Sequence, residues 1–351
     1  MAGGAGLGDD REPTVGSPAS VRLVVAGRAA LRSSTGCRQD VGVLRPVPSV
    51  LLVLLSVLAV ASCGVDGEGG ADGTAPDPRG AQPVAASEAT RSDVDCSPEG
   101  LGADDATEFV VAHYVVDGEL GAACLGQEDE TLLDAWADLV AITPPGQLTD
   151  LGVFAGFVNP AADELDDGAE VPLAFVNALD DDGTSFQMSV DLDEYAADRN
   201  QSLLTIAHEF SHVFTTAASQ VDRSEEAFDS CATYLAADGC LYDDSLIAAW
   251  VAEFWDDGRL DSLDPDEEPS ADAGAELCEA DPSFLGAYAA SDPEEDFAES
   301  FSAYVFDVEV DAQEIQEKLD WLADQPGLVE FRERAEAAGL TPLENAFDRC
   351  G

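Results

Sequence analysis

Basic residues are scarce in this chain. Its 351 residues include 15 Lys+Arg against 72 Asp+Glu, which gives a formal net charge of −57 at pH 7. A surface this acidic repels phosphate backbones, so the composition argues against a nucleic-acid-binding protein. The charge is compatible with a basic substrate or with solubility at high salt, and the sequence does not choose between them.

Histidine is scarcer still, with three residues in the whole chain. Two of them, His208 and His212, stand in one pentapeptide that reads H-E-x-x-H, with Glu209 after the first. Residues 202–217 lack Gly and Pro and repeat apolar residues at helical spacing, which predicts a helix. Residues four apart share a helix face, so both imidazoles can reach one metal ion while Glu209 points at what that ion holds. The apolar stripe lies roughly opposite, so we expect the two histidines to lie off the core-building face.

The apolar run at residues 50–60 is uncharged but short for a membrane span, and it fits the apolar region of a secretory signal. The small residues before Cys63 resemble the bacterial lipobox. That resemblance implies lipid on Cys63 and a protein held at the outer face of the bacterial cell membrane; a secreted protein with an ordinary cleaved signal is the alternative. The stretch before the run is long for a signal, so translation is expected to start near Val41 or Val43 instead of at Met1.

Residues 64–95 contain no aromatic residue and are rich in Gly, Ala, Pro and Asp. Such a composition buries too little apolar area to order itself, which predicts a flexible acidic tether. Residues 1–63 are then an extension with a lipoprotein-type signal, and residues 96–351 form the folded domain. We take this domain to be a monomer.

Cysteine pairs of the form C-x-x-C are missing, which disfavours a zinc ribbon. Of the eight cysteines, six follow Cys63. An even number in an exported chain predicts three disulfides. Cys231 and Cys240 are close in sequence and form the pair that we favour, whereas the other pairings stay open.

Strand patterns precede the H-E-x-x-H helix. Residues 151–158, 171–179 and 185–191 are rich in β-formers, and the turn residues 180–183 between the last two indicate a hairpin. Strands followed directly by such a helix predict an α+β, zincin-like fold. We expect a small mixed or antiparallel sheet whose edge strand lies beside the helix and can pair with an extended substrate.

Helical patterns dominate the rest of the folded domain, with a mostly helical C-terminal part. The third histidine, His113, stands in one of these segments and is expected to be a structural or surface residue. Residues 256–276 are acidic and read as an exposed loop. The predicted helices are residues 105–116, 130–141, most of 217–239, 245–255 and much of the last 60 residues.

A catalytic zinc site takes three protein ligands and keeps one open position. Ala218 stands where the metzincin class would place a third histidine, so that class is excluded and a carboxylate must complete the site. One candidate is Glu225 or Glu226, in a spacing loosely like that of thermolysin-type enzymes. The other is Glu295.

Glu295 belongs to a stretch that opens like a helix, with Asp292 as N-cap and Pro293 in the first turn. Glu295 and Glu299 are four residues apart and share a helix face. One carboxylate can therefore bind the metal while the next supports a ligating histidine from behind.

The two motifs, His-Glu-Phe-Ser-His and the later Glu-Asp-Phe-Ala-Glu-Ser-Phe, together resemble the catalytic domain of anthrax lethal factor and related bacterial gluzincin metallopeptidases. The resemblance covers roughly residues 200–305. It implies one catalytic Zn2+ with Glu295 as third ligand, and it matches Glu299 to the family's second glutamate. It also implies that Tyr288, seven residues before Glu295, helps to stabilise the transition state.

The function predicted from these features is that of a zinc-dependent endopeptidase. It would hydrolyse an extracellular or cell-envelope protein or peptide, with Glu209 activating the zinc-bound water. The alternative is a catalytically inactive, zincin-like surface lipoprotein that acts as a binding module.

Overall fold

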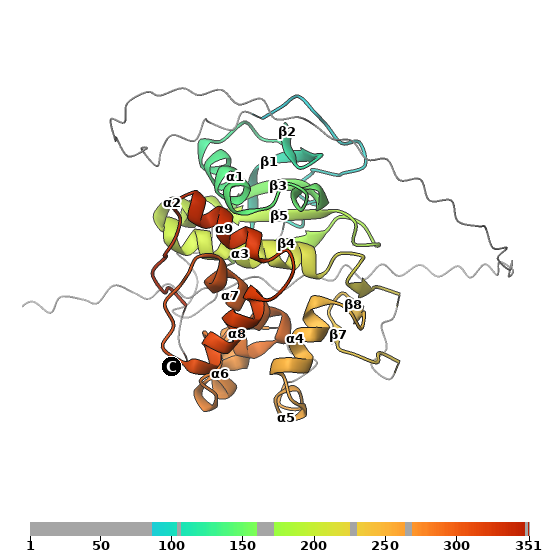
Figure 1. Ribbon diagram of the computed structural model, residues 1–351. Helices are drawn as coiled ribbons and strands as arrows, with labels where there is room; N and C mark the ends of the chain where they lie inside the picture. The colour runs from blue at the N-terminus through green and yellow to red at the C-terminus, as the bar shows by residue number, and fades with distance from the viewer. Residues whose placement is uncertain are drawn as a thin grey trace, which may run out of the picture. The chain divides into compact units, whose positions relative to one another are not determined.

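The computed structural model of the chain describes residues 86–103, 107–159, 172–224, 230–263, 269–347 and 350. They fold as an α+β unit in which one mixed sheet is backed by helices (Figure 1). Cys63, the leader and most of the expected tether lie outside the described residues. The last part of that tether, residues 86–95, lies along the sheet, where Ser87 and Ala89 make backbone hydrogen bonds with β2 (Glu119–Leu125).

The main sheet has five strands in the order β2-β1-β3-β5-β4. β3 and β5 run parallel, and the other neighbouring strands run antiparallel. The predicted hairpin is confirmed, since β4 and β5 pair antiparallel on either side of the turn. β4 forms one edge and packs against the H-E-x-x-H helix. The remaining bounds are β1 Glu108–Val116, β3 Leu151–Val158, β4 Ala174–Ala178 and β5 Phe186–Asp191.

The helix predicted for residues 105–116 is wrong, because this segment is strand β1. It lies between β2 and β3 and is covered on both faces, so its apolar residues do not alternate cleanly with polar ones. A short apolar run of this kind fits either a strand or a helix until its pairing partner is known. Pairing with β3, more than 40 residues further on, decides the outcome (Phe109 opposite Phe157).

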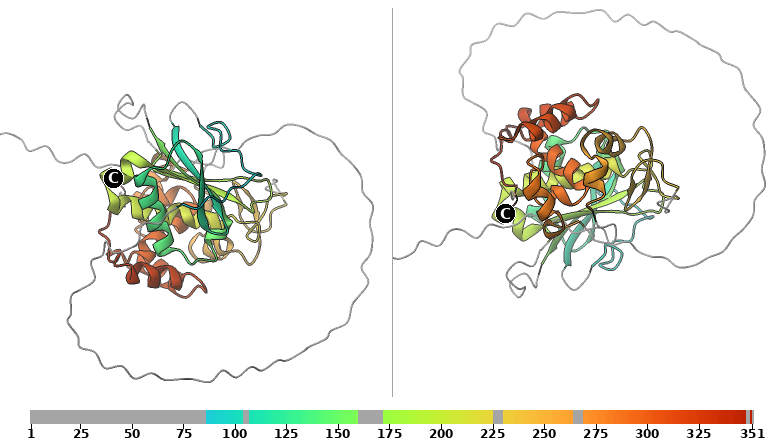
Figure 2. Two further views of the ribbon diagram at one scale, coloured as in Figure 1. Left: turned by 90° about the horizontal axis from the view of Figure 1, so that it is seen from above. Right: turned by 90° about the horizontal axis from the view of Figure 1, so that it is seen from below.

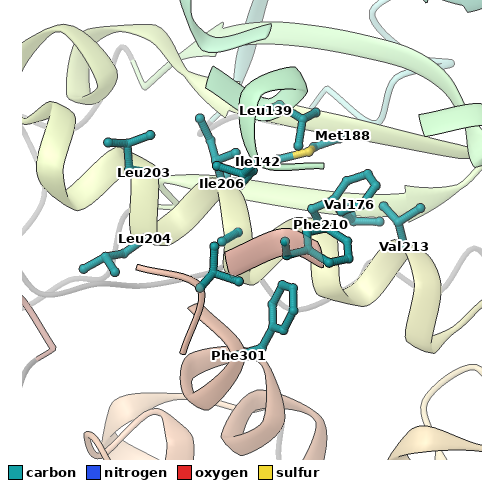
Figure 3. Close-up of a cluster of buried hydrophobic side chains, with 14 of the residues drawn as sticks. Leu139, Ile142, Val176, Met188, Leu203, Leu204, Ile206, Phe210, Val213 and Phe301 are labelled. Atoms are coloured by element: carbon teal, nitrogen blue, oxygen red, sulfur yellow. The ribbon is translucent and has the colours of Figure 1, made fainter. Parts of the chain in front are cut away.

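Helices α1 (Glu130–Ile142) and α3 (Arg199–Thr215) cover one face of the sheet, together with the short α2 (Leu192–Ala197), which contacts both. Figure 3 shows their side chains meeting those of the strands in one buried cluster, which Phe301 reaches from the other side. The N-terminal segment around Cys96 and Leu101 covers the opposite face of the sheet.

The C-terminal helices form a further layer on α3. Figure 1 shows α3 between the sheet and most of these helices, which lie nearest the viewer when the molecule is seen from below in Figure 2. α7 (Pro293–Val305) packs along α3 and is itself held by its neighbours. The last of these helices, α9 (Val329–Ala337), contacts α1 as well as α7. The other helices are α4 Leu246–Phe254, α5 Asp257–Leu260, α6 Ala271–Ala280 and α8 Gln313–Ala323, with 3-10 turns at Leu148–Asp150 and Ala289–Ser291.

Two segment predictions are corrected here. Within residues 217–239, the described parts consist of turns and two short strands: β6 (Val221–Asp222) and β7 (Leu235–Ala236) each pair with β8 (Gly239–Leu241). Gly239 has a φ of 136°, which suits the tight turn between β7 and β8. Residues 256–276, expected to be a loop, contain α5 and the first part of α6.

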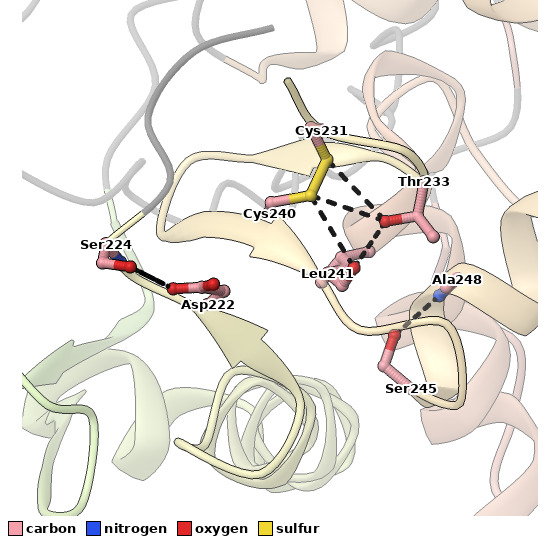
Figure 4. The surroundings of a disulfide bond; sticks show 8 residues. All are labelled: Asp222, Ser224, Cys231, Thr233, Cys240, Leu241, Ser245 and Ala248. Carbon is pink, nitrogen blue, oxygen red and sulfur yellow. Dashed lines mark hydrogen bonds between the residues drawn. A yellow bond between two sulfur atoms is a disulfide. The ribbon is translucent and has the colours of Figure 1, made fainter. Parts of the chain in front are cut away.

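Three disulfides join Cys96 to Cys124, Cys231 to Cys240 and Cys278 to Cys350. The second is the pair favoured from the sequence, and Figure 4 shows it beside Thr233 and Leu241. Three bridges are typical of a non-cytoplasmic, oxidising location. Among the described helices, none is long and apolar enough to cross a membrane.

Candidate metal centre

The H-E-x-x-H motif lies in the second half of α3, and this helix has hardly any solvent face. The sheet covers one side and α7 the other, so His208 is 0% and His212 4% exposed. The expected position of the histidines off the core-building face did not imply this burial. The periodicity of α3 shows where its most apolar side lies but not that another helix covers the polar side.

Three side-chain atoms converge between α3 and α7. The Nε2 atoms of His208 and His212 are 3.3 Å apart. Glu295 Oε2 lies 3.0 Å from His208 Nε2 and 3.5 Å from His212 Nε2. Among the described residues, this is the group of His, Cys, Asp and Glu side chains that could hold a metal ion.

The spacing of these atoms fits a tetrahedral zinc site. With zinc–ligand distances of about 2.0–2.1 Å, two ligands of a tetrahedron stand roughly 3.3–3.4 Å apart. The three observed separations, 3.0, 3.3 and 3.5 Å, bracket that edge length. Two imidazoles and one carboxylate are also a donor set of catalytic zinc.

Glu295 comes from the first turn of α7. As expected from the sequence, Asp292 caps this helix by accepting a hydrogen bond from Glu294 N at 2.7 Å, and Pro293 follows in the first turn. The capped helix begins at a point where its first turn faces α3. Glu295 thereby lies next to His208, although the two are 87 residues apart in sequence. The alternative candidates, Glu225 and Glu226, lie outside the described residues.

The other predicted site residues surround the cluster. Glu209 is 1% exposed, and its Oε1 is 4.0 Å from His208 Nε2. Tyr288 is 3% exposed, with its ring centroid 5.9 Å from that of His208. Glu299 lies one turn after Glu295 and is 2% exposed. Its support of a histidine ring stays a prediction.

The pKa shifts in the cluster favour the forms that bind a metal. Burial lowers the pKa of the His208 imidazole, against an opposing hydrogen bond with Glu295. Burial would raise the pKa of Glu295, but the imidazoles of His212 and His208 outweigh it and hold that pKa below its usual value. A neutral imidazole and an ionised carboxylate are the forms that ligate.

Tyr288 keeps its proton in this environment. Burial first, and then the carboxylates of Glu295, Glu209 and Glu299, raise the pKa of its hydroxyl well above the usual value. The hydroxyl therefore remains a hydrogen-bond donor at neutral and mildly alkaline pH.

The third histidine takes no part in the cluster. His113 lies in β1, is 1% exposed, and its Nδ1 is 2.9 Å from the carbonyl oxygen of Gly121 in β2. Of the two places expected for it, structural or surface, it has the structural one.

A buried ion pair next to Glu295 was not predicted from the sequence. Lys318 Nζ lies 2.6 Å from Asp296 Oδ1, and both side chains are almost fully buried. The sequence does contain a sign of this pair. Lys318 is the only lysine of the chain, and it lies on the apolar stripe of its helix, between Ile315 and Leu322. A lysine on an apolar stripe indicates a buried acidic partner.

No protein-family model matches the chain, and no curated protein or solved structure matches it either.

Proposed function

We propose that the protein is a zinc-dependent peptidase whose active site lies between α3 and α7. The observation that carries this proposal is the convergence of His208, His212 and Glu295 on one point, with the carboxylate of Glu209 beside it. The resemblance of the two motifs to the lethal-factor group of gluzincins supports the same reading.

A metal held by these three residues leaves a coordination position for water or substrate. Zinc bound there would lower the pKa of its water to about 7 and polarise a peptide carbonyl. The protein shields the three ligands from solvent, since they are between 0% and 9% exposed. Removal from bulk water strengthens each electrostatic interaction in the site.

Two residues of the chain handle protons and charge. Glu209 accepts the proton of the attacking water and passes it to the leaving amine. Tyr288, protonated and close to the His208 ring, donates a hydrogen bond to the oxygen on which negative charge develops. Neither role is needed in a protein that only binds a partner, so the pair favours an enzyme over the inactive binding module.

Substrate is expected to approach along β4. This strand is an edge of the five-stranded sheet and packs against α3. An extended peptide that pairs with it would therefore run past the turn of α3 that carries His208 and His212. Export and lipid attachment at Cys63 belong to the same proposal, and the three disulfides support an extracytoplasmic place of action.

The test is the variant Glu209→Gln. Zinc content, measured on purified full-length protein by atomic emission, is expected to stay at one ion per chain. Hydrolysis of a peptide library is expected to fall by about 100-fold or more, as for loss of a general base. Glu333→Gln, an exposed position on α9, is the control and keeps full activity. Full hydrolysis by Glu209→Gln would refute the mechanism.

A further inference from the structure

Asp296 follows the proposed ligand Glu295 directly in sequence, yet its side chain contacts a different set of residues. It is 0% exposed and lies among α4, α7 and α8. On a helix, adjacent residues project about 100° apart. Glu295 can therefore face α3 while Asp296 faces the helices on the other side of α7.

Three donors hold this carboxylate. Lys318 Nζ of α8 lies 2.6 Å from Oδ1. The indole Nε1 atoms of Trp250 in α4 and of Trp255, its C-cap residue, each lie 3.0 Å from Oδ2. Both carboxylate oxygens are thus occupied, by donors from two separate helices, and the first turn of α7 is tied to both.

Lys318 is also held tightly. Its side chain is 1% exposed, and Nζ lies 4.3 Å from the ring centroid of Phe284 and 5.8 Å from that of Trp250. The chain has 14 arginines and one lysine, and that lysine occupies this buried position. Well-packed apolar residues often serve stability as well as a buried ion pair does, so stability alone does not account for the pair.

We propose that Asp296 and Lys318 are positioning residues that orient Glu295 toward the two imidazoles. A rotation of α7 by about 10° about its axis would move a carboxylate about 5.5 Å from that axis by roughly 1 Å. A metal or catalytic constellation tolerates displacements of only about 0.5 Å. The tie from Asp296 to α4 and α8 opposes such a rotation. This inference rests on the proposed metal site and assigns the residues that give it its geometry.

The test compares metal affinity and the absorption spectrum of bound Co2+ in full-length protein. The double variant D296N/K318M removes both charges, so neither is left buried without its partner. We expect its Zn2+ dissociation constant, from chelator competition, to rise by about 10- to 100-fold, as for residues that support metal ligands. The visible Co2+ bands are expected to shift, because the carboxylate no longer binds with its original geometry. Lys318→Arg, which keeps the charge, is expected to lie between wild type and the double variant.

The matched control is R259M/D281N. This pair also joins two elements, with Arg259 Nη2 2.6 Å from Asp281 Oδ2, and Arg259 also lies over Phe284, at 5.5 Å. Among the described residues, neither of the two forms a hydrogen bond or an ion pair with α7. The control variant is expected to change stability without changing the zinc dissociation constant or the Co2+ spectrum.

The outcomes separate the two proposals. If wild type binds Zn2+ and the double variant shows the same dissociation constant and the same Co2+ spectrum, the positioning role is wrong and the metal site stands. If D296N/K318M does not fold, Lys318→Arg decides the matter: a zinc dissociation constant and a Co2+ spectrum in this variant that both equal those of wild type overturn the role. A wild type that binds neither ion overturns the metal site and this inference with it.

Discussion

Metal binding should stabilise the fold strongly, because the three proposed ligands come from two helices far apart in sequence. His208 and Glu295 are 87 residues apart and meet only when α7 packs on α3. The unfolded chain has no such preformed site, so the free energy of binding adds to the free energy of folding. At a free zinc concentration 1,000 times the dissociation constant, the gain is about 4.1 kcal/mol.

This gain corresponds to a large shift in melting temperature. For domains of 150–250 residues, each kcal/mol moves Tm by roughly 2–4 °C, so we expect a rise of roughly 8–16 °C between chelated and zinc-saturated protein. The assay is thermal unfolding followed by circular dichroism over a series of free zinc concentrations. Tm should climb with the logarithm of that concentration once the site is saturated.

Two histidine variants make the assay specific. His212→Ala removes a ligand and should abolish most of the zinc-dependent shift. His113→Ala removes a histidine that is buried elsewhere, so it should lower Tm in the absence of metal but keep the zinc-dependent shift. An equal shift in wild type and His212→Ala would mean that zinc binds the acidic surface, and the reasoning would fail.

Three further predictions follow from single side chains. Tyr288→Phe should lower kcat by about 100-fold with little change in KM, because the lost donor acts on the transition state; an unchanged kcat in steady-state assays excludes that role. Phe301→Ala should cost about 3–5 kcal/mol in urea unfolding, since its ring is 0% exposed and lies 5.1 Å from that of Phe331; a loss below 1 kcal/mol would contradict the packing. Burial, followed by the charge of Glu294, raises the pKa of Asp292 to about 8. The folded state then binds more protons than the unfolded state between about pH 4 and 8, so this group lowers stability as pH rises, by at most about 1.4 kcal/mol per unit. Without metal, the unfolding free energy of Asp292→Asn should fall less than that of wild type between about pH 4 and 8. Parallel profiles of unfolding free energy against pH in the two proteins would contradict the raised pKa of Asp292.

Features with a short-range cause could be read from the order of residues. The H-E-x-x-H helix follows from apolar spacing, and the start of α7 follows from Asp292 and Pro293, whose effects act within one helical turn. The β4–β5 hairpin and the Cys231–Cys240 bridge likewise join residues close in sequence. In each case the interacting residues lie within 16 positions of one another, so local chemistry is sufficient.

Features that depend on distant segments required the packed structure. Strand β1 is extended because β2 and β3 pair with it, whereas its own residues fit a helix equally well. The partners of Cys96 and Cys278, and the burial of the only lysine against Asp296, also depend on which elements become neighbours. The same is true of the metal centre. The histidine pair is specified by one helical turn, but the approach of Glu295 to within 3.0 Å of His208 comes from α7 packing on α3, because helix packing depends on surfaces that segments far apart in the chain present to each other.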